Sequence, residues 1–99
     1  MDRTQIKNMA YAPTYQKGQQ LFQQGDVWEF DVDEDGDFDE INAVVKGSGR
    51  NLYQVDASIN TAEDEIEYID CECPAFSEYA GICKHCVAVL LEYVHRHDR

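Results

Sequence analysis

The sequence lacks a long hydrophobic run. None of its apolar stretches approaches the roughly 18 residues that a membrane-spanning helix needs, and its opening stretch, MDRTQIKNMAYAPTY, contains no apolar segment of signal-peptide length. We therefore expect a cytoplasmic protein that is neither embedded in a membrane nor exported.

Positive charge is also scarce. The 8 Lys and Arg residues stand against 20 Asp and Glu residues, which gives a formal net charge of −12. A domain with this balance repels phosphate groups unless its cations are clustered. Independent binding to DNA is therefore disfavoured, and we favour a protein partner or the rest of a longer parent chain.

The acidic residues gather in two segments, 26–40 and 63–78, and the first of these contains no Lys or Arg. One interpretation is a well-solvated surface that keeps the domain soluble. The other is an acidic face that binds a basic partner or a basic segment of a larger protein. Both interpretations remain open at the level of the sequence.

Hydrophobic periodicity predicts a small α+β fold with an N-terminal helix, a three- to four-stranded antiparallel meander and a C-terminal helix. Residues 1–12 show no periodicity, so we expect a flexible N-terminus before a single domain over residues 13–99. The first helix is predicted over residues 14–24, where Gly18 indicates a close approach to the sheet. The last helix is predicted over residues 84–97.

Alternation of apolar and polar residues identifies the strands. Trp28, Phe30 and Val32 alternate with acidic residues, and we expect them on the buried side of the first strand. Asp35-Gly36 then predicts a tight turn. The remaining strands are predicted around residues 41–45, 53–59 and 66–69.

Four cysteines are crowded into one short segment. Without an export signal, such a cluster favours a metal site over disulfide bonds, because bridges between residues this close would staple almost nothing. Zinc requires four thiolate or imidazole ligands in a tetrahedron. The candidates are Cys71, Cys73, Cys83, His85 and Cys86.

The predicted local structure fits a shared metal. Cys71 and Cys73 would point to the same side at the end of a strand, because side chains at i and i+2 share a face. Pro74 then ends the strand. Cys83 and His85 do not share a face inside a regular helix, so we expect Cys83 in the turn before the last helix.

This set resembles the SWIM zinc finger, whose pattern is C-x-C, a variable loop and C-x-H. The sequence carries it as CECP in the first half and GICKHCVAVLL in the second. The resemblance extends upstream to YQKGQQLFQQG, a Val-led strand, the KGSG turn and a Tyr-x-Val strand. It implies one structural Zn²⁺ held by Cys71, Cys73, Cys83 and His85.

Cys86 has two interpretations. It is either a small buried hydrophobe on the core face of the helix, or a ligand that replaces His85 and gives a site of four sulfurs. Cys83 and Cys86 also form a C-x-x-C at a helix start, which is typical of thiol redox proteins. The expected βαβ unit is missing, however, and Cys71 and Cys73 would then have no role.

The resemblance also implies a binding role. SWIM domains are commonly proposed to bind DNA or protein, and they occur in longer chains such as bacterial Swi2/Snf2-type ATPases, of which this chain would be an N-terminal region. We favour docking or regulation through protein contact, with nucleic-acid binding as the alternative. Contact candidates are Phe76, Tyr79 and Lys84. With all four metal positions taken by protein and no catalytic set visible, we expect no enzymatic activity.

Overall fold

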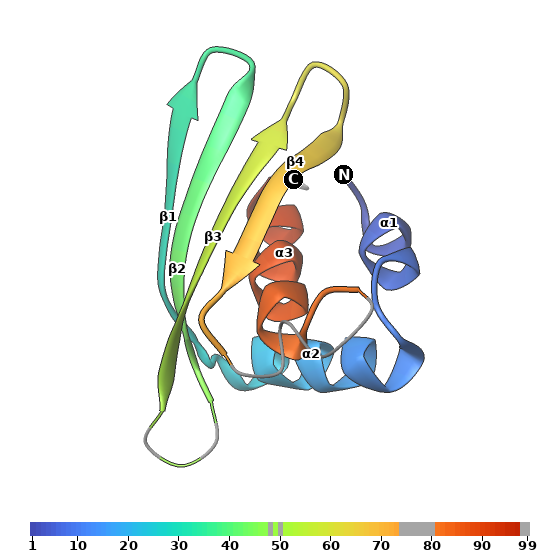
Figure 1. Cartoon of the computed structure of the whole chain (residues 1–99), viewed down its shortest axis with the longest axis vertical. Helices are drawn as coiled ribbons and strands as arrows, with labels where there is room; N and C mark the ends of the chain where they lie inside the picture. Colours follow the sequence, from blue (N-terminus) through green and yellow to red (C-terminus); the bar gives the residue numbers. More distant parts are fainter. Residues whose placement is uncertain (48, 50, 74–80, 98–99) are drawn as a thin grey trace.

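The computed structural model describes residues 1–47, 49, 51–73 and 81–97. Within these residues, three helices lie on one side of a four-stranded sheet (Figure 1). This arrangement confirms the predicted α+β class. The elements are α1 (Arg3–Asn8), α2 (Ala12–Gln24), β1 (Val27–Asp35), β2 (Phe38–Lys46), β3 (Leu52–Asn60), β4 (Glu65–Cys71) and α3 (Lys84–His97).

The sheet is a simple meander. Its strand order is β1-β2-β3-β4, and every neighbouring pair is antiparallel. Gly36 has a φ of 60° in the turn between β1 and β2, a conformation that glycine adopts without a steric penalty. Alternate residues of the central strands face the helices and are buried, such as Ile41 in β2 and Val55 in β3. The alternation in the sequence therefore placed the core face of these two strands correctly.

The start of β1 differs from the prediction. The register shifts between Val27 and Glu29, and a shift of this kind turns the following side chain away from the alternating pattern. Trp28 is consequently 56% exposed instead of buried. Beyond this irregularity, Phe30 and Val32 pack against the core as expected.

Helix α3 is the central element of the core. Its residues from Cys86 to Leu91 are all buried, because the helix is covered by the sheet on one side and by α2 on another (Figure 1). Gly18 of α2 permits this packing, since a Cβ there would lie 2.4 Å from Cγ1 of Val87. The close approach that Gly18 indicates is therefore to α3, and not to the sheet.

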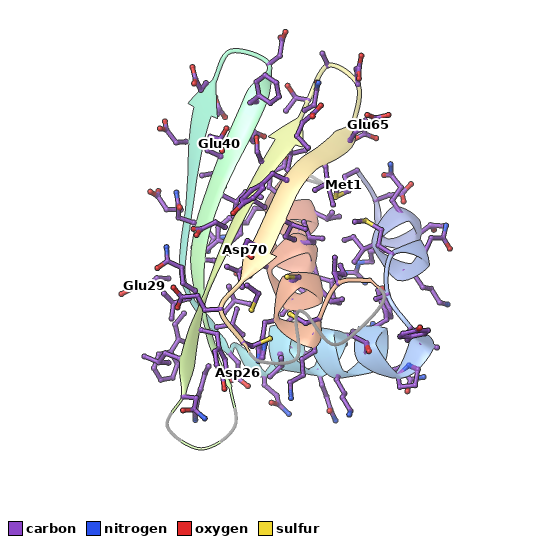
Figure 2. All side chains as sticks on the ribbon, in the orientation of Figure 1. Met1, Asp26, Glu29, Glu40, Glu65 and Asp70 are labelled. Carbon is purple, nitrogen blue, oxygen red and sulfur yellow. The ribbon has the colours of Figure 1, made fainter. Side chains whose placement is uncertain are left out.

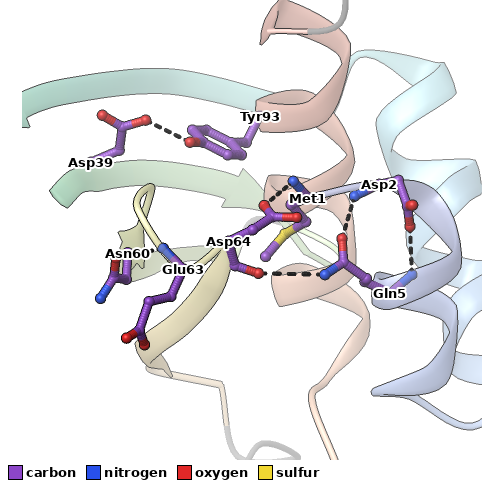
Figure 3. Close-up of polar contacts among 8 residues, drawn as sticks. All are labelled: Met1, Asp2, Gln5, Asp39, Asn60, Glu63, Asp64 and Tyr93. Atoms are coloured by element: carbon purple, nitrogen blue, oxygen red, sulfur yellow. Dashed lines mark hydrogen bonds and ion pairs between the residues drawn. The ribbon is translucent and has the colours of Figure 1, made fainter. Parts of the chain in front are cut away.

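Residues 1–12, expected to be flexible, contain α1. Asp2 and Gln5 form a reciprocal capping box at its start, and Ile6 is fully buried in the core. Gln5 Nε2 also donates to the backbone carbonyl of Asp64, 3.4 Å away (Figure 3). Sequence periodicity missed α1 because a helix of 6 residues with one buried side chain shows no repeat.

A buried polar contact ties α3 to the sheet. The Tyr93 hydroxyl donates to Oδ2 of Asp39 at 2.5 Å (Figure 3). Burial, together with this carboxylate, raises the pKa of Tyr93 above its ordinary value.

In the described part of the chain, no helix is both long and apolar enough to span a membrane.

Candidate metal centre

Four side chains from two separate segments meet at one point. The ligand atoms of Cys71, Cys73, Cys83 and His85 all lie within 4.8 Å of one another. Each of these residues is at most 6% exposed. A compact, buried group of three sulfurs and one imidazole matches the donor set of a structural zinc site.

The fold brings the two halves of this group together. Cys71 is the last residue of β4 and pairs with Val55 on β3. Cys73 follows two residues later. Between the two cysteines, the Glu72 N–H donates to the Gln54 carbonyl at 3.2 Å. The pairing therefore continues beyond the end of β4 and fixes both cysteines at the sheet edge.

The second half lies where α3 starts. Cys83 immediately precedes the first helical residue, Lys84, as the sequence predicts. Its carbonyl accepts a hydrogen bond from the Val87 N–H at 3.1 Å. His85 is in the first turn, so the non-helical position of Cys83 allows both side chains to face the β4 cysteines.

The imidazole of His85 turns its Nδ1 atom toward the sulfurs. Nδ1 lies 3.8 Å from Sγ of Cys71 and 3.9 Å from Sγ of Cys83. Tetrahedral zinc with ordinary bond lengths implies a nitrogen-to-sulfur separation of about 3.6 Å. The observed distances are close to this value, so the site needs only a small contraction to hold the ion.

Two residues to which the sequence analysis gave no role at the site support the ring. Tyr53 packs on His85 with the ring centroids 4.7 Å apart. Gly47 makes room for Tyr53, because a Cβ at position 47 would lie 2.3 Å from the tyrosine ring. Nε2 of His85 is buried and has no hydrogen-bond partner among the described residues. The support that Tyr53 and Gly47 give to the ring depends on the pairing of β2 with β3, so residue spacing in the sequence gave no signal for it.

The sulfurs interact directly. Hydrogen bonding with Cys71 and with Cys86 lowers the pKa of Cys83 far below its ordinary value. The pKa of Cys71 is raised, chiefly by its hydrogen bond with Cys83, and the pKa of Cys86 is raised, chiefly by its hydrogen bond with Cys71. The cluster thus already favours one thiolate, which is the form of cysteine that binds metal.

Cys86 lies beside the cluster. Its side chain is fully buried in the core, as expected of a small hydrophobe, and its Sγ is 3.6 Å from Sγ of Cys83. It is not one of the four residues whose ligand atoms all lie within 4.8 Å of one another. Its interpretation as a replacement ligand for His85 remains a prediction.

Of the three contact candidates, the structure describes only Lys84. Phe76 and Tyr79 lie outside the described residues. Lys84 is partly buried, and its backbone carbonyl faces Gly18 of α2. A separate group of carboxylates, Glu63, Glu65 and Glu67, is exposed around the turn between β3 and β4 and the start of β4. Exposed carboxylates of this kind commonly occur without a metal.

Comparison with known proteins supports the site. The family model of the SWIM zinc finger matches residues 53–94, which include most of β3, all of β4, the four residues of the cluster and most of α3. Comparisons with curated proteins and with solved structures gave no significant match. The family match and the clustered ligands lead to the same conclusion: this chain carries a SWIM zinc finger over residues 53–94.

Proposed function

We propose that the chain is a non-catalytic module that binds one Zn²⁺ through three sulfurs and Nδ1 of His85. The closed geometry of the cluster is the observation that supports this proposal. Its sulfurs come from Cys71, Cys73 and Cys83, and its ligand atoms are mutually close and shielded from water. Four protein ligands leave no coordination position for an activated water, so the ion supplies a cross-link and no chemistry.

The cross-link has a defined structural task. It joins the end of β4 to the beginning of α3, and α3 is the central element of the core. A domain of 99 residues buries a smaller share of its surface than a larger domain does, so an added cross-link contributes relatively more to its stability. The metal site therefore holds together the two elements whose packing buries the inner face of the sheet.

The proposed role of the module is docking or regulation through protein contact, in the cytoplasm and within a longer protein of the Swi2/Snf2 helicase type. The net charge of −12 supports protein over nucleic acid as the partner. The metal site adds no attraction for phosphate, since three thiolates and a neutral imidazole leave Zn²⁺ with a net charge of about −1.

Two measurements test this proposal. Native mass spectrometry should find one zinc per chain, and its removal by a chelator should abolish the folded far-UV circular dichroism spectrum. Fluorescence anisotropy with labelled duplex DNA at physiological salt should show only weak binding without sequence preference. A metal-free folded protein with a Cys83–Cys86 disulfide would refute the zinc site. A submicromolar DNA complex would refute the choice of partner.

A further inference from the structure

The outer face of the sheet is the surface opposite the helices. Figure 1 shows all three helices on the other side, and Figure 2 shows Glu29 pointing away from them. Apolar side chains are nonetheless present on this outer face. Trp28 is 56% exposed and Leu52 is 51% exposed. Exposed apolar groups that lie together on a sheet face are typical of a binding surface.

These side chains line a shallow groove. A hollow of about 260 Å³ lies among Trp28, Glu29, Val44, Leu52, Gln54 and Glu72. An adjoining hollow of about 180 Å³ shares three of these residues and adds Asp31, Asn42 and Ala43. The groove therefore crosses the strands with an apolar floor and carboxylates beside it.

The strand register concentrates negative charge next to the groove. Asp31 pairs with Asn42, Asn42 with Asp56, and Asp56 with Asp70, so one row across the sheet contains three carboxylates. Within this row Asp56 and Asp70 lie directly opposite each other, and like charges placed in this way destabilise a sheet. The ion pairs among the described residues, Met1–Asp64 and Arg96–Glu92, involve none of this row. A cationic partner would relieve this repulsion.

Cation–aromatic packing already occurs on this protein. Lys46 is the only Lys or Arg within the four strands, and its Nζ lies 5.8 Å from the centre of the Trp28 ring. On the inner face, the guanidinium of Arg96 lies 4.6 Å from the centre of the Phe30 ring. An exposed indole beside carboxylates can accept a further cation in the same way.

We propose that this groove binds an extended, arginine-rich segment of a partner protein. An arginine side chain matches each part of the surface. Its planar guanidinium can stack on Trp28 and form a bidentate contact with Glu29, while its aliphatic stem lies along Val44 and Leu52. Lysine lacks the planar fork, so arginine is preferred. The inference rests on the proposed docking role and specifies its surface and the chemistry of its partner.

The test uses the full zinc-loaded chain and a fluorescein-labelled peptide of ten residues with Arg at alternate positions. Binding is measured by fluorescence anisotropy at physiological salt. Trp28→Ala and the double variant Glu29→Gln/Asp31→Asn should each weaken binding by about fivefold. The matched control, Glu63→Gln/Glu65→Gln, removes the same charge from exposed residues at the β3–β4 turn and should weaken binding less than about twofold. Trp28→Phe, which keeps an aromatic ring, should restore part of the affinity.

The outcomes separate the groove from the docking role. Equal weakening by the two double variants would show general charge attraction and overturn the inference. Unchanged affinity in the groove variants, or no binding by the wild-type chain, would also overturn it. None of these results bears on the DNA titration, which tests the docking role independently. Zinc content and the circular dichroism spectrum of each variant, if equal to wild type, show that the substitutions act on the surface alone.

Discussion

Replacing Cys83 by serine is the perturbation that most severely tests the structural role of the metal. Cys83 is 1% exposed and belongs to the four-residue cluster. Structural zinc contributes about 10–16 kcal/mol in zinc-finger peptides, whereas a whole domain is stable by only about 5–15 kcal/mol. Losing the ion therefore removes as much free energy as the fold possesses. We expect Cys83→Ser to lack bound zinc and to be largely unfolded.

Cys86→Ala is the matched control for this substitution. Cys86 is also a buried cysteine, and its Sγ lies 3.6 Å from that of Cys83, but it is outside the cluster of four. Truncating it deletes one core sulfur, which should cost about 1–2 kcal/mol, and zinc should stay bound.

The assay for both variants is thermal unfolding by circular dichroism, with zinc content measured on the same sample. A cooperative, native-like melt of Cys83→Ser without zinc would refute the claim that metal binding is coupled to folding. Loss of zinc from Cys86→Ala, together with its retention by His85→Ala, would instead identify a site of four sulfurs.

Three further expectations concern the packing and polar contacts around α3. Gly18→Ala should lower the free energy of unfolding by about 1–3 kcal/mol, because the added Cβ would collide with Val87. The control Gln20→Ala, on the exposed side of α2, should change the free energy of unfolding little. Equal effects of the two substitutions in urea denaturation would contradict the close packing of α2 on α3. Gly47→Ala should displace Tyr53 from His85 and speed zinc loss to a competing chelator, and an unchanged rate would argue against ring support. Tyr93→Phe removes the hydrogen bond to Asp39 and should cost about 1–3 kcal/mol at neutral pH, as measured by urea denaturation.

The pH dependence of the Tyr93 contribution has a definite sign. Folding raises the pKa of Tyr93, through burial first and then through its contact with Asp39. The folded state therefore favours the protonated hydroxyl. The stabilisation that protonated Tyr93 gives the fold is complete below the pKa of tyrosine in the unfolded chain, about 10, and is lost as pH rises through the pKa of Tyr93 in the folded state. Stability should thus fall above about pH 10, and Tyr93→Phe should lack this component of the decline. An identical alkaline profile in the variant would show that Tyr93 does not contribute.

The sequence predicted the core face of the sheet and the metal cluster for physical reasons. Ile41 and Val55 belong to strands buried on one face, and this arrangement imposes a period of two on the sequence. Cys71 and Cys83 each belong to a short Cys-x-Cys or Cys-x-His spacing that favours a shared metal, and the resemblance to the SWIM zinc finger, not the spacing, implies His85 rather than Cys86 as the fourth ligand. The strand alternation and the cysteine spacing both lie within short stretches of sequence, so they can be recognised without knowledge of the fold.

The features that the sequence did not reveal depend on contacts between distant segments. Ile6 makes α1 part of the core, yet no pattern around it indicates what it packs against. Trp28 fits an alternating strand until the register shift turns it outward. The packing of Tyr53 on His85 likewise arises only after β3 has been placed beside the site.

X-ray absorption at the zinc edge is the most direct measurement of the central claim. The zinc-loaded chain should show three sulfur neighbours at about 2.3 Å and one nitrogen at about 2.0–2.1 Å. A shell of four sulfurs would assign Cys86 to the metal in place of His85, and a shell containing water oxygen would contradict a closed structural site.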